Sequence, residues 1–125
     1  MKTVIATTAA PGAIGPYSQA IEANGFVFVS GQLPIDPATG AFAEGGIEAQ
    51  TEQALKNLTA LAEAAGCTLD NGVKTTVFLS DINNFAAMNG VYAKFFATDC
   101  PGRSAFQVAA LPKAALVEIE AILAK

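Results

Sequence analysis

The most informative absence in this 125-residue sequence is histidine, of which there is none. Histidine is the commonest general base in enzymes and a frequent metal ligand, so its absence excludes the serine and cysteine triads that depend on it and every histidine-based metal site. The two cysteines, Cys67 and Cys100, lie far apart in the chain and make a poor zinc site. We therefore expect no bound metal or cofactor, and any proton transfer must use another side chain, such as a glutamate.

Charged residues are also scarce, at 14% of the chain, where about 25% is usual for a soluble domain. Seven Lys and Arg against eleven Asp and Glu give a net charge of −4, and the basic residues are scattered. Nucleic-acid binding needs a basic stripe, so the composition argues against such partners. No stretch approaches the roughly 20 apolar residues that span a bilayer, and threonines interrupt the N-terminal apolar run, so it does not resemble a signal peptide. These features predict a cytoplasmic protein with reduced thiols and no membrane partner.

What the chain has in excess is apolar surface, because 52% of its residues are hydrophobic. The length suits a single domain over residues 1–125 with one core, and it is short for two domains. A monomer of this size would expose part of its apolar surface to water. The natural place to bury that surplus is a subunit interface.

The spacing of apolar residues predicts six strands and two helices. Strands are expected at residues 2–6, 18–23, 26–29, 74–79, 105–110 and 116–120, and helices at residues 47–65 and 85–96. Asn24-Gly25 is a strong hairpin signal between the second and third strands. The order is that of an α+β fold, in which two helices can cover only one face of the sheet. We therefore expect an oligomer packed through its uncovered sheet faces.

The candidate site lies near the C-terminus. Arg103 follows the Pro101-Gly102 turn at the start of a strand, where a rigid planar guanidinium could grip a small carboxylate with paired hydrogen bonds. Glu118 and Glu120 alternate with apolar residues and so share one face of the last strand. If the last two strands pair, Arg103 could neutralise one of these carboxylates. A structural Arg–Glu pair at a sheet edge explains this segment equally well.

Several motifs resemble those of one known family, the RidA (YjgF) family. They are Gly15-Pro16-Tyr17-Ser18-Gln19, Val29-Ser30-Gly31-Gln32, Lys74-Thr75-Thr76-Val77-Phe78-Leu79, Pro101-Gly102-Arg103-Ser104-Ala105-Phe106, Leu111-Pro112 and Val117-Glu118-Ile119. The resemblance runs through essentially the whole chain in the family's order. It implies a chorismate-mutase-like fold, a six-stranded mixed sheet with two helices on one face, assembled as a homotrimer with sites between subunits. It also implies a cofactor-free deaminase that hydrolyses reactive enamines and imines, such as 2-aminoacrylate and 2-iminobutanoate, to 2-keto acids and ammonia.

The resemblance also implies roles for individual residues. Arg103 would hold the substrate carboxylate, and Glu118 would handle the attacking water and its proton. Tyr17, counted with the catalytic residues, would line the cleft from the neighbouring subunit together with Ser30 and Gly31.

Two further positions belong to the expected substrate-binding set. Asn89, on the second helix, matches an asparagine often found near the family's site. Ala105 stands where many relatives have cysteine, so only its backbone could serve as a donor. The segment from residue 96 to 101 is shorter than in well-known relatives, which affects the depth of the cleft. Cys100 beside it is either a reactive or an inert thiol.

Two other classes of function remain open. One is a non-enzymatic module that binds a small carboxylate such as a 2-keto acid through Arg103. The other is the ribonuclease or translation-inhibitor role attributed to some relatives, against which the acidic charge argues. A carboxylate beside a bound carboxylate weakens binding unless it moves a proton, so Glu118 near Arg103 favours catalysis.

Overall fold

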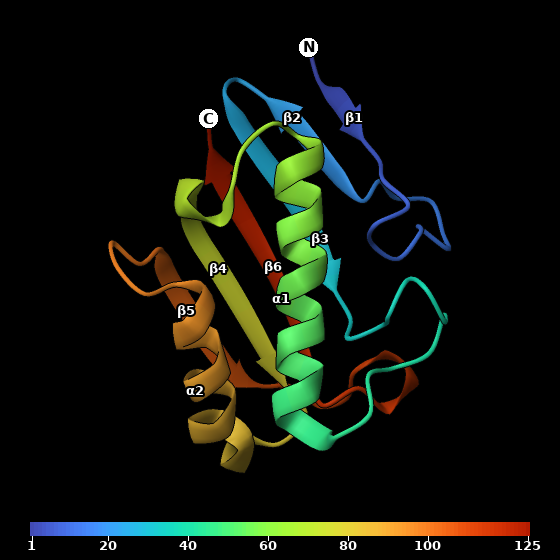
Figure 1. Cartoon of the computed structure of the whole chain (residues 1–125), viewed down its shortest axis with the longest axis vertical. Helices are drawn as coiled ribbons and strands as arrows, with labels where there is room; N and C mark the ends of the chain where they lie inside the picture. Colours follow the sequence, from blue (N-terminus) through green and yellow to red (C-terminus); the bar gives the residue numbers. More distant parts are fainter.

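The computed structural model describes all 125 residues and confirms the α+β class, with six strands and two helices. The elements are β1 (Thr3–Ile5), β2 (Ala20–Ala23), β3 (Phe26–Gln32), α1 (Gly46–Ala64), β4 (Gly72–Leu79), α2 (Phe85–Phe95), β5 (Gly102–Gln107) and β6 (Val117–Ala124). Both helices lie on the same side of the sheet (Figure 1). Neither helix combines the length and the apolarity required to cross a bilayer.

The strands form one mixed sheet in the order β1-β2-β3-β6-β4-β5. Only β4 and β5 are parallel neighbours, and every other pair is antiparallel. The predicted hairpin joins β2 to β3, where Asn24 and Gly25 have φ angles of 52° and 79°. Two successive positive φ angles give the turn whose twist matches that of the flanking strands.

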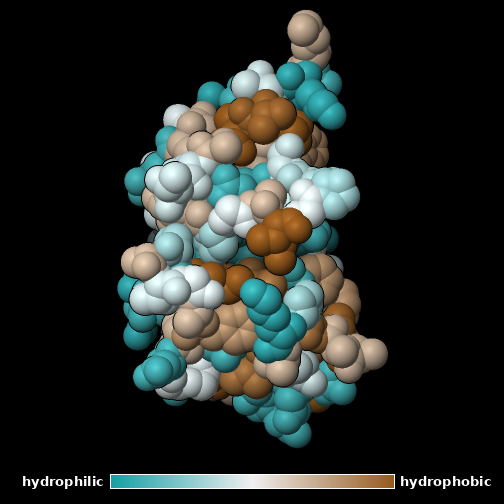
Figure 2. Space-filling model, turned by 90° about the vertical axis from the view of Figure 1, so that its right-hand side faces the viewer, coloured by the Kyte–Doolittle hydropathy of each residue, from teal (hydrophilic) through white to brown (hydrophobic).

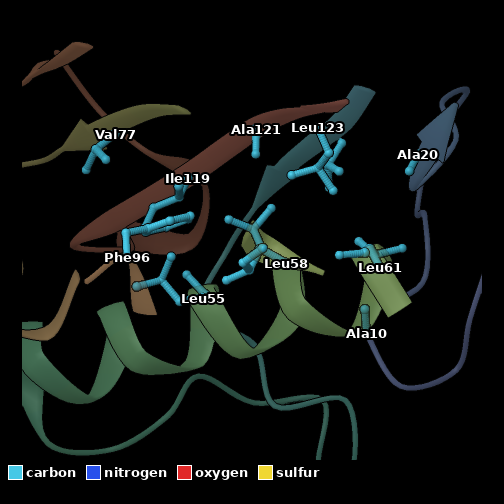
Figure 3. Packing of buried hydrophobic residues seen from close by; sticks show 14 of the residues in the cluster. Ala10, Ala20, Leu55, Leu58, Leu61, Val77, Phe96, Ile119, Ala121 and Leu123 are labelled. Carbon is cyan, nitrogen blue, oxygen red and sulfur yellow. The ribbon is translucent and has the colours of Figure 1, made fainter. Parts of the chain in front are cut away.

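The core lies between the sheet and α1. Leucines three residues apart on the helix, Leu55, Leu58 and Leu61, are fully buried. In Figure 3 they lie between α1 and the β6 residues Ile119, Ala121 and Leu123, which occupy alternate positions on the inner face of the sheet. A helical period of 3.6 and a strand period of 2 thus place both apolar sets in one layer.

The face of the sheet away from the helices is uncovered and carries exposed aromatic side chains. Phe26, Phe28 and Phe106 remain 41%, 44% and 44% exposed. The Phe26 and Phe28 rings are neighbours at 6.2 Å, and Phe28 is paired across the strands with Ile122. Within one chain, β3 is therefore covered on one face only, and its alternate residues Val27 and Val29 are buried.

Residues 18 and 19 do not belong to a strand, contrary to the sequence prediction of a strand over residues 18–23. The side chain of buried Gln19 instead binds the backbone of the preceding loop: its Oε1 accepts from the Thr7 N–H at 2.8 Å and its Nε2 donates to the Pro11 carbonyl at 2.7 Å. Strand β3 continues through Ser30 and Gly31, beyond the predicted end at residue 29, with a register shift between Val29 and Gln32.

Candidate active site

Arg103 is held on the helix-facing side of β5, which is the edge strand of the sheet. Its cross-strand partner on β4 is Thr75, which is buried beneath α2. The Arg103 Nη1 donates to Asn89 Oδ1 at 2.6 Å. The guanidinium carbon lies 4.7 Å from the centre of the Tyr92 ring and 5.5 Å from that of Phe85. One amide and two aromatic faces therefore hold the only arginine in the chain.

These three contacts come from one face of α2. Phe85, Asn89 and Tyr92 follow each other at spacings of four and three residues, which places their side chains in one line on a helix. Tyr92 is itself anchored to the sheet by a 2.7 Å hydrogen bond between its hydroxyl and that of Thr75. Burial raises the pKa of Tyr92 above its usual 10.0, although the Thr75 bond and the Arg103 charge oppose the shift. We call Arg103, Asn89, Tyr92 and Phe85 the arginine half-site.

A cavity of about 410 Å³ adjoins the arginine half-site. It is lined by Asn89, Tyr92, Ala93, Phe96, Cys100, Pro101 and Arg103. The Cys100 thiol lies at this cavity and donates to the Phe96 carbonyl at 3.3 Å. Arg103 makes no ion pair with any carboxylate of the chain, so most of its donors remain available to a ligand.

Glu118 lies on the opposite, uncovered side of the sheet. Its β6 neighbours Val117 and Ile119 are buried under α1, and its cross-strand partner is Phe78. The carboxylate is about half-buried and makes no ion pair within the chain. Burial raises the pKa of Glu118 above its usual 4.5, and the nearby charge of Glu120 raises it further. A carboxyl group of this kind can exchange protons closer to neutral pH.

Gly31 makes room for this carboxylate. A Cβ at position 31 would lie 2.6 Å from Glu118 Oε2 and 2.9 Å from its Cδ, closer than real contacts allow. Glu118 therefore lies directly against the β3 backbone, and we call Glu118 with Gly31 the glutamate half-site. Ser30 is engaged elsewhere, since its hydroxyl donates to the Ser18 carbonyl at 2.6 Å.

A second cavity, of about 470 Å³, opens beside Gly31 between the loops of residues 7–17 and 32–40. Tyr17 lines it and is 51% exposed, and Lys113 lines it from the connection between β5 and β6. Figure 2 shows the side of the molecule that carries these loops, where hydrophobic areas are separated by hydrophilic residues.

The structure separates the two residues that the sequence prediction had paired. Strand β4 lies between β5 and β6, so the last two strands are not neighbours, and Arg103 and Glu118 point to opposite faces of the sheet. The predicted contact between them is therefore wrong within one chain. Asn89 does lie against Arg103, Gly31 lies against Glu118, and Ala105 shares the face of Arg103 two residues along β5.

Sequence reasoning did not single out Tyr92, Phe85 or Thr75 as site residues. Both aromatic residues belong to the apolar side chains of α2, where aromatic residues ordinarily fill the core. The signal that could have found them is the F-x3-N-x2-Y spacing, which puts an amide between two rings on one helix face. Thr75 carried no such signal, because its contact with Tyr92 joins residues far apart in sequence.

Comparison with known proteins identifies relatives along nearly the whole chain. The model of the endoribonuclease L-PSP family matches residues 7–125. A 2-iminobutanoate/2-iminopropanoate deaminase of Homo sapiens is 48% identical over 122 residues, which are 98% of this chain and 89% of that protein. The crystal structure of YyfA, a Rid-family protein of Yersinia pestis, has a TM-score of 0.97 at 53% identity and covers 100% of both chains. That of Escherichia coli TdcF with bound serine has a TM-score of 0.94 at 43% identity and covers 98% of each chain. The chain therefore belongs to the endoribonuclease L-PSP family, the RidA family whose motifs it carries.

Proposed function

We propose that this protein is a cofactor-free deaminase that hydrolyses 2-imino acids and their enamine tautomers to 2-keto acids and ammonia. The observation that carries the proposal is the pair of half-sites. One presents a rigid guanidinium with donors to spare, and the other presents a half-buried carboxyl group with a raised pKa. Together they supply what a 2-imino acid requires, a carboxylate anchor and a group that can activate water.

We propose further that the two half-sites meet between the subunits of a homotrimer. Arg103 and Glu118 lie on opposite faces of one chain, so a single chain cannot bring both to one small substrate. The exposed phenylalanines of the open sheet face supply apolar surface for the association. Each site would then take its arginine half-site from one subunit and its glutamate half-site from the neighbour. Tyr17, with its exposed ring, would line the same cleft on the glutamate side.

The proposed reaction needs little beyond these groups. Arg103 fixes the carboxylate of the protonated imine, whose C2 is already electrophilic. Glu118 accepts a proton from water while the water oxygen bonds to C2, which gives a carbinolamine. Glu118 returns that proton to the nitrogen, and the C–N bond breaks with its electron pair leaving on ammonia. The Glu118 carboxylate then accepts the hydroxyl proton as the carbonyl forms. General acid–base assistance of this type is typically worth about 100- to 10,000-fold, which suits an intermediate that water already attacks slowly.

The relatives support this choice of substrate by their names. The human protein is a 2-iminobutanoate/2-iminopropanoate deaminase, and the serine bound to TdcF carries the carboxylate and the C2 nitrogen that such a site would recognise. The main alternative is a module that binds 2-keto acids through Arg103 without catalysis. A ribonuclease is less favoured, because the chain is acidic and its seven basic residues are scattered along the sequence and never form a run.

The test is to generate 2-aminoacrylate and 2-iminobutanoate in situ and to measure ammonia release with and without the protein. Arg103→Ala should lose both imine hydrolysis and 2-keto acid binding, and Arg103→Lys should not restore them, because an ammonium cannot reproduce the planar donors. Glu118→Gln should keep or tighten keto-acid binding while turnover falls.

Glu52→Gln is the matched control, because Glu52 is an exposed carboxylate on α1 with only a 4.0 Å contact to Lys56. It should behave like the wild type in every assay. A wild-type protein that binds keto acids without accelerating hydrolysis would establish the binding module instead. Full activity in Glu118→Gln would remove Glu118 from the mechanism.

A further inference from the structure

Tyr92 occupies a position between the sheet and the guanidinium that the proposed reaction does not use. Its ring is stacked against Arg103, with the guanidinium carbon 4.7 Å from the ring centre, and only 6% of the residue is exposed. At its other end the hydroxyl bonds Thr75 at 2.7 Å, and Thr75 is 1% exposed. The cross-strand register of Thr75 is with Arg103 itself. Tyr92 therefore contacts Arg103 through its ring and contacts Thr75, on the neighbouring strand, through its hydroxyl.

We infer that Tyr92, anchored by Thr75, is a positioning residue that fixes the plane of the Arg103 guanidinium for the substrate carboxylate. The inference deepens the proposed function and rests on it for the identity of the carboxylate. The Asn89 bond restrains one nitrogen of the guanidinium but leaves the group free to tilt about that contact. The Tyr92 ring, over which the guanidinium carbon lies, restrains this tilt, because cation–π attraction and packing both favour a limited range of orientations.

The Thr75–Tyr92 bond fixes the ring in turn. A tyrosine ring held only by packing can slide along the helix axis, but a buried hydroxyl without a partner is costly, so the bond to Thr75 restricts where the ring can lie. The Phe96 ring also packs against the Tyr92 ring, with 4.6 Å between the two ring centres. Presetting the guanidinium before binding reduces the conformational entropy that the Arg103 side chain loses when a ligand binds, which strengthens binding and leaves the chemical step unchanged.

The test compares Tyr92→Leu with Phe95→Leu, a control that removes a ring from the same helix without touching Arg103. Tyr92→Leu should raise the Kd for pyruvate and the KM for 2-iminobutanoate roughly three- to thirtyfold, with kcat within about twofold of the wild type. Tyr92→Phe and Thr75→Val should each have a smaller effect. Their double variant should match either single one, because both remove the same bond.

An independent readout is available because Arg103 is the only arginine in the chain. The nitrogen-15 NMR signals of its guanidinium need no assignment, and the rate of rotation about the Nε–Cζ bond reports how firmly the group is held. Rotation should be slow in the wild type and in Phe95→Leu and faster in Tyr92→Leu.

Unchanged rotation or unchanged pyruvate affinity in Tyr92→Leu would overturn the inference, as would an equal effect of Phe95→Leu. If the wild type neither binds pyruvate nor hydrolyses imines, the proposed function fails. In that case faster rotation in Tyr92→Leu would still support the positioning role for whatever ligand Arg103 serves, and unchanged rotation would overturn it.

Discussion

The absence of a side chain at Gly31 leaves the space that the Glu118 carboxylate occupies. The carboxylate rests on the β3 backbone where any Cβ would collide with it, and the collision involves the far end of a flexible glutamate side chain. A larger residue at position 31 can therefore be accommodated by moving the carboxylate, at little cost to the fold. The position of the carboxylate that we propose to transfer the proton thus depends on glycine at residue 31.

Gly31→Ala should leave stability nearly unchanged but reduce imine hydrolysis by about 10- to 100-fold, because a displacement of about 1 Å is costly to catalysis. Pyruvate binding through Arg103 should persist. Gly90→Ala is the control, since an added Cβ there meets nothing within 4 Å. Steady-state ammonia release and calorimetric binding distinguish these outcomes, and a fully active Gly31→Ala would contradict the assignment of Glu118.

The raised pKa of Glu118 also has a consequence for stability. A carboxyl group with a folded-state pKa above its unfolded value of about 4.5 favours the folded state most when it is protonated. Its contribution is therefore present below pH 4.5 and is lost as the pH rises through the raised folded-state pKa.

Glu118→Gln should accordingly be more stable than the wild type at pH 7, because glutamine carries no charge to bury. The advantage should shrink as the pH falls and vanish below pH 4.5. Urea unfolding at a series of pH values measures the difference. An advantage that is independent of pH would assign it to packing rather than to titration.

At the scale of elements, the connection from β5 to β6 stores backbone strain. Lys113 and Ala114 have successive φ angles of 56° and 58°, in the left-handed region that residues with a Cβ adopt at a cost. The same segment brings Pro112 and Lys113 to the wall of the larger cavity. The strained turn thus positions part of the proposed cleft.

Ala114→Gly should therefore stabilise the protein, by a net of about 0.5 to 1 kcal/mol once the greater unfolded-state entropy of glycine is subtracted. Ala109→Gly, at an exposed residue without a positive φ, should be neutral or destabilising. Thermal unfolding of the two variants tests the difference. A lower Tm for Ala114→Gly would show that the turn is not strained.

At the scale of the whole molecule, the open sheet face and the separated half-sites point to the same assembly. The exposed phenylalanines favour association, and the opposite placement of Arg103 and Glu118 means that the proposed trimer would complete its sites between subunits. Light scattering should then find a trimer at low micromolar concentration. A well-behaved monomer would contradict this assembly.

Mixed trimers provide a stronger test of shared sites. Arg103→Ala and Glu118→Gln should each be inactive alone, but every trimer containing both would have one site with Arg103 and Glu118 intact. Random mixing at equal amounts should then restore roughly a quarter of wild-type activity, as follows from three equivalent heterologous interfaces. The two variants are co-expressed with different affinity tags so that mixed trimers can be isolated, and an ammonia assay measures the activity that they recover. No recovery from isolated mixed trimers would mean that each site belongs to one subunit.

The sequence alone determined much of the local structure of this protein. The leucine spacing of α1 and the alternation in β6 follow from the periods of the helix and the strand, which decide which residues share a face. Asn24-Gly25 specified its hairpin because only such residues adopt the turn at low cost. The absence of histidine restricted the chemistry, and the motifs around Arg103 and Glu118 indicated the family.

Only the tertiary structure decided which strands are neighbours and on which side of the sheet each residue of a strand lies. Periodicity cannot tell which strands pair, because backbone hydrogen bonds are the same for every residue and pairing depends on the collective burial of distant segments. The insertion of β4 between β5 and β6 therefore could not be predicted from either strand, and it places Arg103 and Glu118 on opposite sides of the sheet. The Gly31–Glu118 and Thr75–Tyr92 contacts are likewise long-range, set by the sheet register and by the packing of α2 against it.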